Sequence, residues 1–180
     1  MKLFRLLALP LVVFSPLCLH AQLGLYAAFT VQNVGGPVND GYDLYGGTFG
    51  AYLASGRFAI LSAGVDLRGS FAKSGGTSFN TGSIGPRLGL NTHILPIHPY
   101  VEATVGLANI NVAGGSPSNG TKFEYQLLGG LDFTIFPRID WRVAEYSYGG
   151  VSAMSNYNLH PKSLSTGIVL RLPRLLLPLP

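Results

Sequence analysis

The stretch Phe58–Lys73, which reads FAILSAGVDLRGSFAK, decides the fold. One side of it carries Ala59, Leu61, Ala63, Val65, Leu67 and Phe71, and the other carries Ser62, Gly64, Asp66, Arg68 and Ser70. Strict alternation of apolar and polar residues indicates a strand that lies between two different environments. The polar side consists of small residues and charges of both signs, which is typical of a narrow interior packed with its own side chains.

The same alternation recurs along the chain. The expected strands are 23–32, 44–55, 58–73, 79–91, 100–111, 122–136, 139–148 and 163–172. Their apolar sides carry large aliphatic residues, with aromatic residues toward the segment ends, which suits a band that faces lipid. The pattern predicts an all-β protein, an eight-stranded antiparallel up-and-down transmembrane β-barrel.

The connections between these segments also alternate in length. The stretches 55–57 and 137–138 are tight and 92–99 is moderate, whereas the other set is 33–43, 74–78, 112–121 and 149–162. Three of these last four are longer, and all are rich in Gly, Ser, Asn and Pro. Short turns on one side and longer loops on the other are typical of outer-membrane barrels, whose turns face the periplasm. Both ends of the barrel are therefore expected on the periplasmic side.

The composition agrees with a barrel in lipid. The 180 residues are 47% hydrophobic and only 11% charged, and they include 24 Gly, 10 Phe and 9 Tyr. A soluble domain carries about 25% charged residues. Composition alone leaves open a soluble β-sandwich with a large core. The chain has no cluster of Lys and Arg, so nucleic acid is not expected as a partner.

The first segment is predicted to be a signal peptide, residues 1–21. Lys2 and Arg5 precede an apolar stretch, 6–19, and the small Ala21 stands before the expected cleavage site. Export through the Sec pathway would remove both cations and lower the net charge from +4 to about +2. Cys18, the one cysteine, leaves a lipoprotein as an alternative. The barrel is expected over 22–172, followed by a Pro/Leu-rich periplasmic tail, 173–180.

Four segments carry a resemblance to a known family. They are Tyr100–Gly106 (YVEATVG), Gly129–Phe133 (GGLDF), Arg138–Tyr146 (RIDWRVAEY) and Ser165–Leu170 (STGIVL). In them the chain resembles the OmpA-type eight-stranded outer-membrane β-barrels. The resemblance implies a monomer in the outer membrane of a Gram-negative cell, surrounded by outer-membrane lipid and inserted by the barrel-assembly machinery. Such barrels usually end on an aromatic residue, whereas here Leu172 is followed by the tail.

The polar sides of the strands collect charged residues that are expected inside the barrel. The predicted interior charge network is Asp66, Arg68, Arg87, Glu102, Glu124, Asp132 and Arg142, with Glu145 nearby. Charges in a narrow interior are expected to pair, because an isolated buried charge is costly. Arg142 and Glu145 have opposite parity, so both can face inward only if a β-bulge lies near Ala144.

Three functions follow from this arrangement. The first is a structural barrel with a largely closed, salt-bridged interior and four surface loops, serving envelope integrity or surface interaction. The second is a narrow porin-like channel for small solutes.

The third function is an enzyme that modifies envelope lipids, which needs a base beside a nucleophile. His93 and His98 are expected in the fourth connection on the periplasmic side, and His160 in the last long loop near Ser152, Ser155 and Ser163. Solvated loop histidines explain these positions more simply. No metal-binding spacing is present, so the sequence predicts no catalytic site, metal or cofactor.

Overall fold

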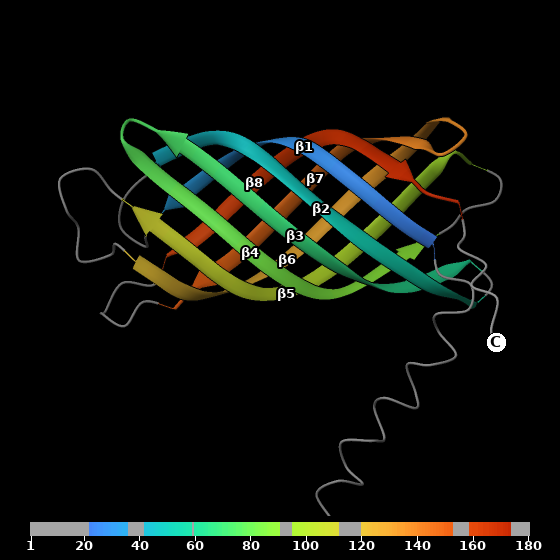
Figure 1. The fold of residues 1–180 in the computed structure, drawn as a ribbon, viewed down its shortest axis with the longest axis horizontal. Coiled ribbons are helices and arrows are strands. Elements are labelled where there is room, and N and C mark those ends of the chain that lie inside the picture. Colours follow the sequence, from blue (N-terminus) through green and yellow to red (C-terminus); the bar gives the residue numbers. More distant parts are fainter. Residues whose placement is uncertain are drawn as a thin grey trace, which may run out of the picture.

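The computed structural model describes residues 22–35, 42–58, 60–90, 95–111, 120–152 and 159–173. The eight strands are β1 (Gln22–Gly35), β2 (Tyr42–Phe58), β3 (Leu61–Ser74), β4 (Thr77–Leu90), β5 (Ile97–Asn111), β6 (Gly120–Phe136), β7 (Ile139–Val151) and β8 (His160–Arg171). Each strand pairs antiparallel with the next, and β8 pairs with β1 to close the barrel (Figure 1). The predicted eight-stranded up-and-down barrel is confirmed. In the described ranges no helix is long and apolar enough to cross a membrane.

The two ends of the barrel differ in their connections. The end at which β1 begins and β8 ends, called the terminal end, joins β2 to β3 and β6 to β7 within a few residues. The opposite end, called the loop end, carries the connections after β1, β3, β5 and β7. At the terminal end the main-chain N–H of Leu172 donates to the carbonyl of Leu23 at 2.8 Å, which fixes the last described residues beside the first. The predicted signal peptide and most of the tail lie outside the described residues.

Several strands are longer than predicted. The turn expected at 55–57 was wrong, because β2 continues to Phe58 and the pairing shifts between Ser55 and Arg57. A bulge at Gly56 absorbs the extra residue and lets the strand continue past the break in alternation. The strand β5 already begins at Ile97 and β8 at His160, so His98 and His160 lie in strands and not in connections. His93 lies outside the described residues.

The connection between β3 and β4 is shorter than the predicted 74–78. Ser74 pairs with Thr77, and only Gly75 (φ 55°) and Gly76 (φ 82°) form the turn. Two successive residues with positive φ make a type I′ hairpin, whose twist matches that of the paired strands. Glycine at both positions therefore sets a tight reversal at the loop end, visible as the green hairpin in Figure 1.

The strands are strongly staggered around the barrel. A row of paired residues can be followed through Tyr26, Gly50, Arg68, Ser83, Gly106, Glu124, Val151 and Leu159. The next residue after Leu159, His160, pairs with Gly35, so the row returns to β1 far from where it started. Such a stagger accompanies strands that are tilted to the barrel axis and an interior that side chains can fill.

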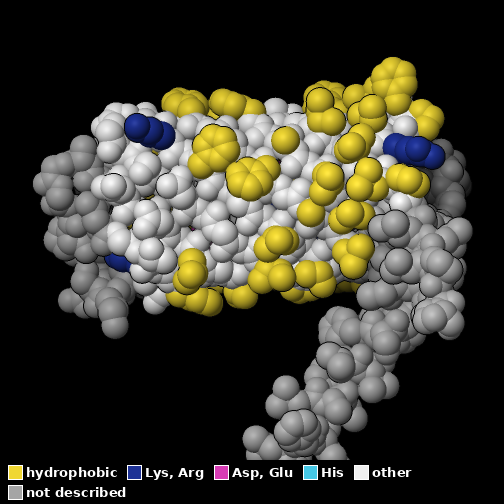
Figure 2. Space-filling view, in the orientation of Figure 1, with side chains coloured by type: hydrophobic (Ala, Val, Ile, Leu, Met, Phe, Trp, Pro, Cys, Tyr) yellow, Lys and Arg dark blue, Asp and Glu magenta, His cyan; other side chains and the backbone are white. Residues whose placement is uncertain are grey.

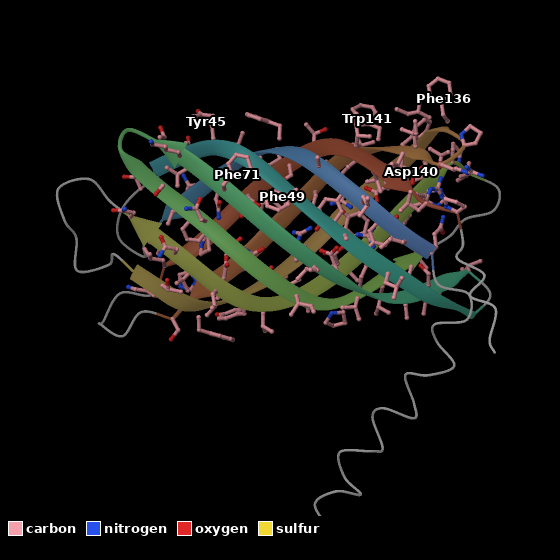
Figure 3. The ribbon with its side chains drawn as sticks, in the orientation of Figure 1. Tyr45, Phe49, Phe71, Phe136, Asp140 and Trp141 are labelled. Carbon is pink, nitrogen blue, oxygen red and sulfur yellow. The ribbon has the colours of Figure 1, made fainter. Side chains whose placement is uncertain are left out.

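Large apolar side chains face outward around the barrel (Figure 2). Leu67, Val101, Leu127 and Ile168, from four different strands, are each between 58% and 63% exposed. Tyr45, Phe49 and Phe71 lie toward the loop end, whereas Phe136 and Trp141 lie toward the terminal end (Figure 3). An apolar band with aromatic residues at both borders is the outer surface expected of a barrel in a bilayer.

Candidate functional site

Most of the charged side chains of the interior form one connected cluster in the half of the barrel nearer the terminal end. This central network consists of Asp66, Arg68, Arg87, Glu102, Asp132, Arg142 and Glu145, together with the phenols of Tyr26, Tyr52 and Tyr100. All ten residues are at most 7% exposed. Period-two alternation points them inward, because residues of one parity face one side of the sheet.

Glu145 on β7 is the hub of the central network. Its Oε2 accepts hydrogen bonds from Arg68 (2.9 Å), Arg142 (3.0 Å) and the hydroxyl of Tyr100 (2.6 Å). One carboxylate thereby joins side chains from β3, β5 and β7. Charge-assisted hydrogen bonds of this kind are about twice as strong as neutral ones.

Two further carboxylates hold the remaining arginine groups. Asp132 accepts from Arg142 at 3.0 Å through Oδ1 and from Arg87 at 3.2 Å through Oδ2. Glu102 accepts from Arg87 through Oε1, and its Oε2 lies 3.5 Å from Arg68. The arginines and carboxylates therefore alternate across the interior, and the pairs link β3, β4, β5, β6 and β7.

Tyrosines complete the central network, although the sequence pattern indicated no role for them. The Arg87 guanidinium lies between two rings, 3.6 Å from the centroid of Tyr100 and 4.2 Å from that of Tyr52. Arg142 lies 4.2 Å from the ring of Tyr26, whose hydroxyl donates to Asp66 at 2.7 Å. Parity could have found these residues, because each has the inward parity of the polar residues around it.

A bulge in β7 brings Arg142 and Glu145 to the same side. Asp132 on β6 pairs with Arg142, but its neighbour Leu131 pairs with Ala144, so Val143 is the extra residue. The pairing with β8 shifts between Arg142 and Glu145 as well. The predicted bulge near Ala144 is confirmed, and both charged side chains are buried.

Glu124 does not join the central network. It lies closer to the loop end, and the structure gives its carboxylate one hydrogen bond, from Gln126. Its Oε2 is buried and has no hydrogen-bond partner among the described residues. Glu124 is therefore the member of the predicted network that the structure does not bring together with the others.

Between the central network and the loop end the interior changes character twice. A layer of hydroxyl groups comes first, with Thr30 bonded to Thr48 (2.7 Å) and Ser165 (2.9 Å). Beyond it lies an apolar plug, formed by Leu44, Ala72, Phe79, Ala108, Ile110 and Val151, with Val34 and Leu159 packed against it. All six core members of the plug are at most 3% exposed. Phe79 and Leu44 are its largest fully buried side chains.

The terminal end holds a recess of about 40 Å³. Its lining includes Tyr52, Arg87, His98, Asp140 and Arg171. Arg171 donates to Asp140 at 2.6 Å, and the hydroxyl of Thr134 also donates to Asp140, at 2.7 Å. A space of this size has room for no more than a few water molecules. The recess therefore ends on the side chains of the central network.

Solved structures share this architecture. The chain matches Neisserial surface protein A at a TM-score of 0.55 with 22% sequence identity, covering 84% of this chain and 97% of that one. It matches the N-terminal β-barrel domain of Pseudomonas aeruginosa OprF at a TM-score of 0.52 with 17% identity, covering 83% and 99%. The fold is that of the OmpA-type outer-membrane β-barrels. No protein-family model matches the sequence, and no curated protein matches it.

Of the two histidines that the structure describes, His160 makes a ring contact, whereas His98 contacts a hydroxyl that is already bonded to Arg171 and Asp140. The hydroxyl of Ser163 is bonded to Ser147 at 2.6 Å, and the ring of His160 stacks on Tyr148 at a centroid distance of 6.1 Å. His98 Nε2 lies 3.0 Å from the hydroxyl of Thr134, which itself donates to Asp140. Within the described residues, no group of three or more His, Cys, Asp or Glu side chains could hold a metal ion.

Proposed function

We propose that this protein is a structural barrel of the outer membrane, with a closed interior and a loop end that faces the cell exterior. The observation that supports this most is the double closure of the interior. The central network fills one half, and the apolar plug fills the loop end. A barrel closed in this way serves envelope integrity or contacts at the cell surface, not the passage or conversion of solutes.

The membrane location rests on the outward apolar band together with the fold. More than half of the surface of side chains such as Leu127 and Ile168 is exposed, which a soluble barrel would not maintain. Expression of the full chain in a Gram-negative host tests this. The processed protein is expected in the outer-membrane fraction, and its gel mobility should change on boiling. Recovery as a soluble periplasmic protein would contradict the proposal.

A narrow channel is the alternative that the interior argues against. The ion pairs Arg68–Glu145 and Arg142–Asp132 are 2.9 and 3.0 Å long and fully enclosed. An eight-stranded barrel has an interior just wide enough for its own side chains. The purified protein in planar bilayers is expected to give no discrete conductance steps in salt solution. Reproducible steps that persist in independent preparations would establish the channel instead.

We propose further that the protein is not an enzyme. The charged side chains of the central network are paired with one another, and the hydroxyl of Ser163, three residues from His160, bonds to Ser147. Mass analysis of lipid A from cells that express the protein is expected to match that of cells without it. A mass change that disappears with His160→Ala would overturn this part of the proposal.

A further inference from the structure

The outer surface of β6, β7 and β8 near the loop end collects polar aromatic residues and a lysine. This surface, called the tyrosine patch, consists of Tyr125, Tyr146, Tyr148, His160 and Lys162. The three tyrosines are each 44–51% exposed, and Lys162 is exposed as well. All five side chains have outward parity on their strands. They therefore lie on the outer side of the barrel, which faces lipid in the proposed outer-membrane protein.

The strand register holds the members of the tyrosine patch together. Lys162 on β8 pairs with Tyr148 on β7, and His160 follows on the same face of β8. The rings of His160 and Tyr148 stack with an interplanar angle of 7°. On β6, Leu127 pairs with Tyr148 and Tyr125 pairs with Gly150. A Cβ at Gly150 would overlap the ring of Tyr125, so this ring lies flat across β7 beside Tyr148.

The opposite sector of the barrel lacks such a patch. In the row that starts from Phe71, the paired residues on β4, β5 and β6 are Asn80, Asn109 and Thr121, all exposed. The face of β3, β4 and β5 turned to the viewer in Figure 2 is largely white toward the loop end. Lys73 on β3 also faces outward near the loop end, but its paired neighbours are Tyr45 and Ser78. Among the described side chains, three tyrosines gather near Lys162, whereas Lys73 is paired with one, Tyr45.

Apolar side chains continue the tyrosine patch toward the middle of the barrel. Leu164 and Ile168 follow Lys162 on the outer face of β8, at 57% and 60% exposure. An amphiphile whose headgroup contacts Lys162 could lay its chains along these residues. Tyrosine suits the border of a bilayer because its ring is apolar and its hydroxyl is polar.

The charge of the tyrosine patch favours an anionic headgroup. Within the described residues Lys162 forms no ion pair, and six carboxylates point into the barrel: Asp66, Glu102, Glu124, Asp132, Asp140 and Glu145. The exposed Asp43 on β2 accepts from Asn33 at 2.8 Å. A lysine with hydroxyl donors beside it matches the charge and the acceptor oxygens of a phosphate group.

We propose that the tyrosine patch binds the phosphate-bearing headgroup of one anionic lipid, with its acyl chains along Leu164 and Ile168. The inference rests on the proposed membrane location. Lys162 supplies the charge, the phenol hydroxyls of Tyr146 and Tyr148 donate hydrogen bonds, and His160 keeps the Tyr148 ring in place. The lipid is a stoichiometric partner of this sector and not part of a general annulus.

Native mass spectrometry of the full-length processed protein tests the proposal, with phosphatidylglycerol titrated against phosphatidylcholine. The wild type is expected to retain one phosphatidylglycerol in preference to phosphatidylcholine. Lys162→Gln should weaken this retention about five-fold, the factor that corresponds to ~1 kcal/mol per lysine at an anionic membrane surface. As a single variant, Tyr148→Leu should weaken retention more than Lys162→Gln does. Lys73→Gln is the matched control and should leave retention unchanged.

Several outcomes would overturn the lipid site. Equal effects of Lys162→Gln and Lys73→Gln would mean general surface charge, and full competition by inorganic phosphate alone would mean an anion site without a lipid. A dimer that disappears with Tyr148→Leu would assign the patch to a second copy of the chain. Heat-modifiable mobility of every variant, measured in parallel, separates these outcomes from a failure of the membrane proposal itself.

Discussion

Two glutamates of the same interior have opposite roles. Glu145 accepts three hydrogen bonds from Arg68, Arg142 and Tyr100, whereas Glu124 receives one from Gln126. Removing one partner of a buried ion pair leaves the other charge without compensation, which is costly. Burial of a charge with no cationic partner is itself unfavourable. Position in the interior, and not residue type, therefore decides what each carboxylate contributes.

Glu145→Gln is expected to destabilise the barrel. The amide cannot balance the charges of Arg68 and Arg142, so the free energy of unfolding should fall by about 3 kcal/mol or more. Urea titration of the protein in lipid vesicles measures this free energy, with the folded fraction determined from the heat-modifiable gel mobility. An unchanged midpoint would show that Glu145 is not the hub of the central network.

Glu124→Gln is expected to change the free energy of unfolding in the opposite direction. Its amide oxygen can still accept from Gln126, and a buried negative charge without a cationic partner is removed. The unfolding free energy should stay constant or rise by about 1 kcal/mol. The same urea titration applies, and a loss comparable to that of Glu145→Gln would place Glu124 in an ionic contact that the structure does not contain.

A glycine makes room for one of the tyrosines of the central network. A Cβ at Gly130 would overlap the ring of Tyr100, whereas at the adjacent Gly129 the nearest heavy atom is 4.0 Å away. Gly130→Ala should displace the ring, break the bond from Tyr100 to Glu145 and lower stability by about 2 kcal/mol. Gly129→Ala is the control on the outer face and should be nearly neutral. Equal midpoints for the two variants would contradict the packing of Tyr100.

At the level of the strand, the bulge in β7 exposes a main-chain carbonyl on the lipid side. The hydroxyl of Thr166 on β8 donates to the carbonyl oxygen of Arg142 at 2.9 Å, and the indole of Trp141 donates to Thr166 at 3.2 Å. Lipid offers no hydrogen bonds to an open carbonyl, so a side chain has to supply one. Thr166 is thus the residue that makes the bulge compatible with a bilayer.

Replacing Thr166 tests this role. Thr166→Val keeps the shape but leaves the Arg142 carbonyl unpaired, which should cost about 1–3 kcal/mol. Thr166→Ser keeps the hydroxyl and should retain most of the stability. The fluorescence of Trp141, the one tryptophan of the chain, should shift in Thr166→Val because its hydrogen bond is lost. Indistinguishable Val and Ser variants would contradict the capping role.

Much of the element level could be predicted from sequence because period-two alternation is strong in every strand. It predicted the order and number of strands and the bulge, since Arg142 and Glu145 could face inward together in no other way. The strand ends were less predictable. His98 and His160 extend the pairing beyond the alternating cores, because an antiparallel ladder continues until the chain physically reverses. The extra residue Gly56 interrupts the alternation in β2, so the sequence pattern did not indicate that this strand continues to Phe58.

The partners within the interior needed three-dimensional information. Sequence parity places Asp66 and Glu102 on the inner face, but the stagger around the barrel decides which arginine each one meets. It also decides that Glu124 lies next to the apolar plug and away from the arginines. Tyrosines such as Tyr100 were overlooked because an aromatic residue was expected on the outer face.

For the molecule as a whole, the interior is closed by two independent layers. Phe79→Ala would open space in the apolar plug and should lower stability by about 3–5 kcal/mol. It should still not produce conductance in planar bilayers, because the central network continues to close the half of the barrel nearer the terminal end. Conductance steps in Phe79→Ala that the wild type lacks would show that the plug alone closes the barrel.

The bulge at Val143 also constrains how the gene can change in length. Because successive residues face opposite sides of a sheet, loss of the Val143 codon would shift one part of β7 by a residue relative to its neighbours. Either Glu145 and Ser147 would then turn toward lipid while Tyr146 and Tyr148 turned inward, or Arg142 and Asp140 would be turned out. Substitutions at Val143 should therefore be tolerated far more readily than its deletion. In descendants of this sequence, insertions and deletions should accumulate in the connections of the loop end and spare β7.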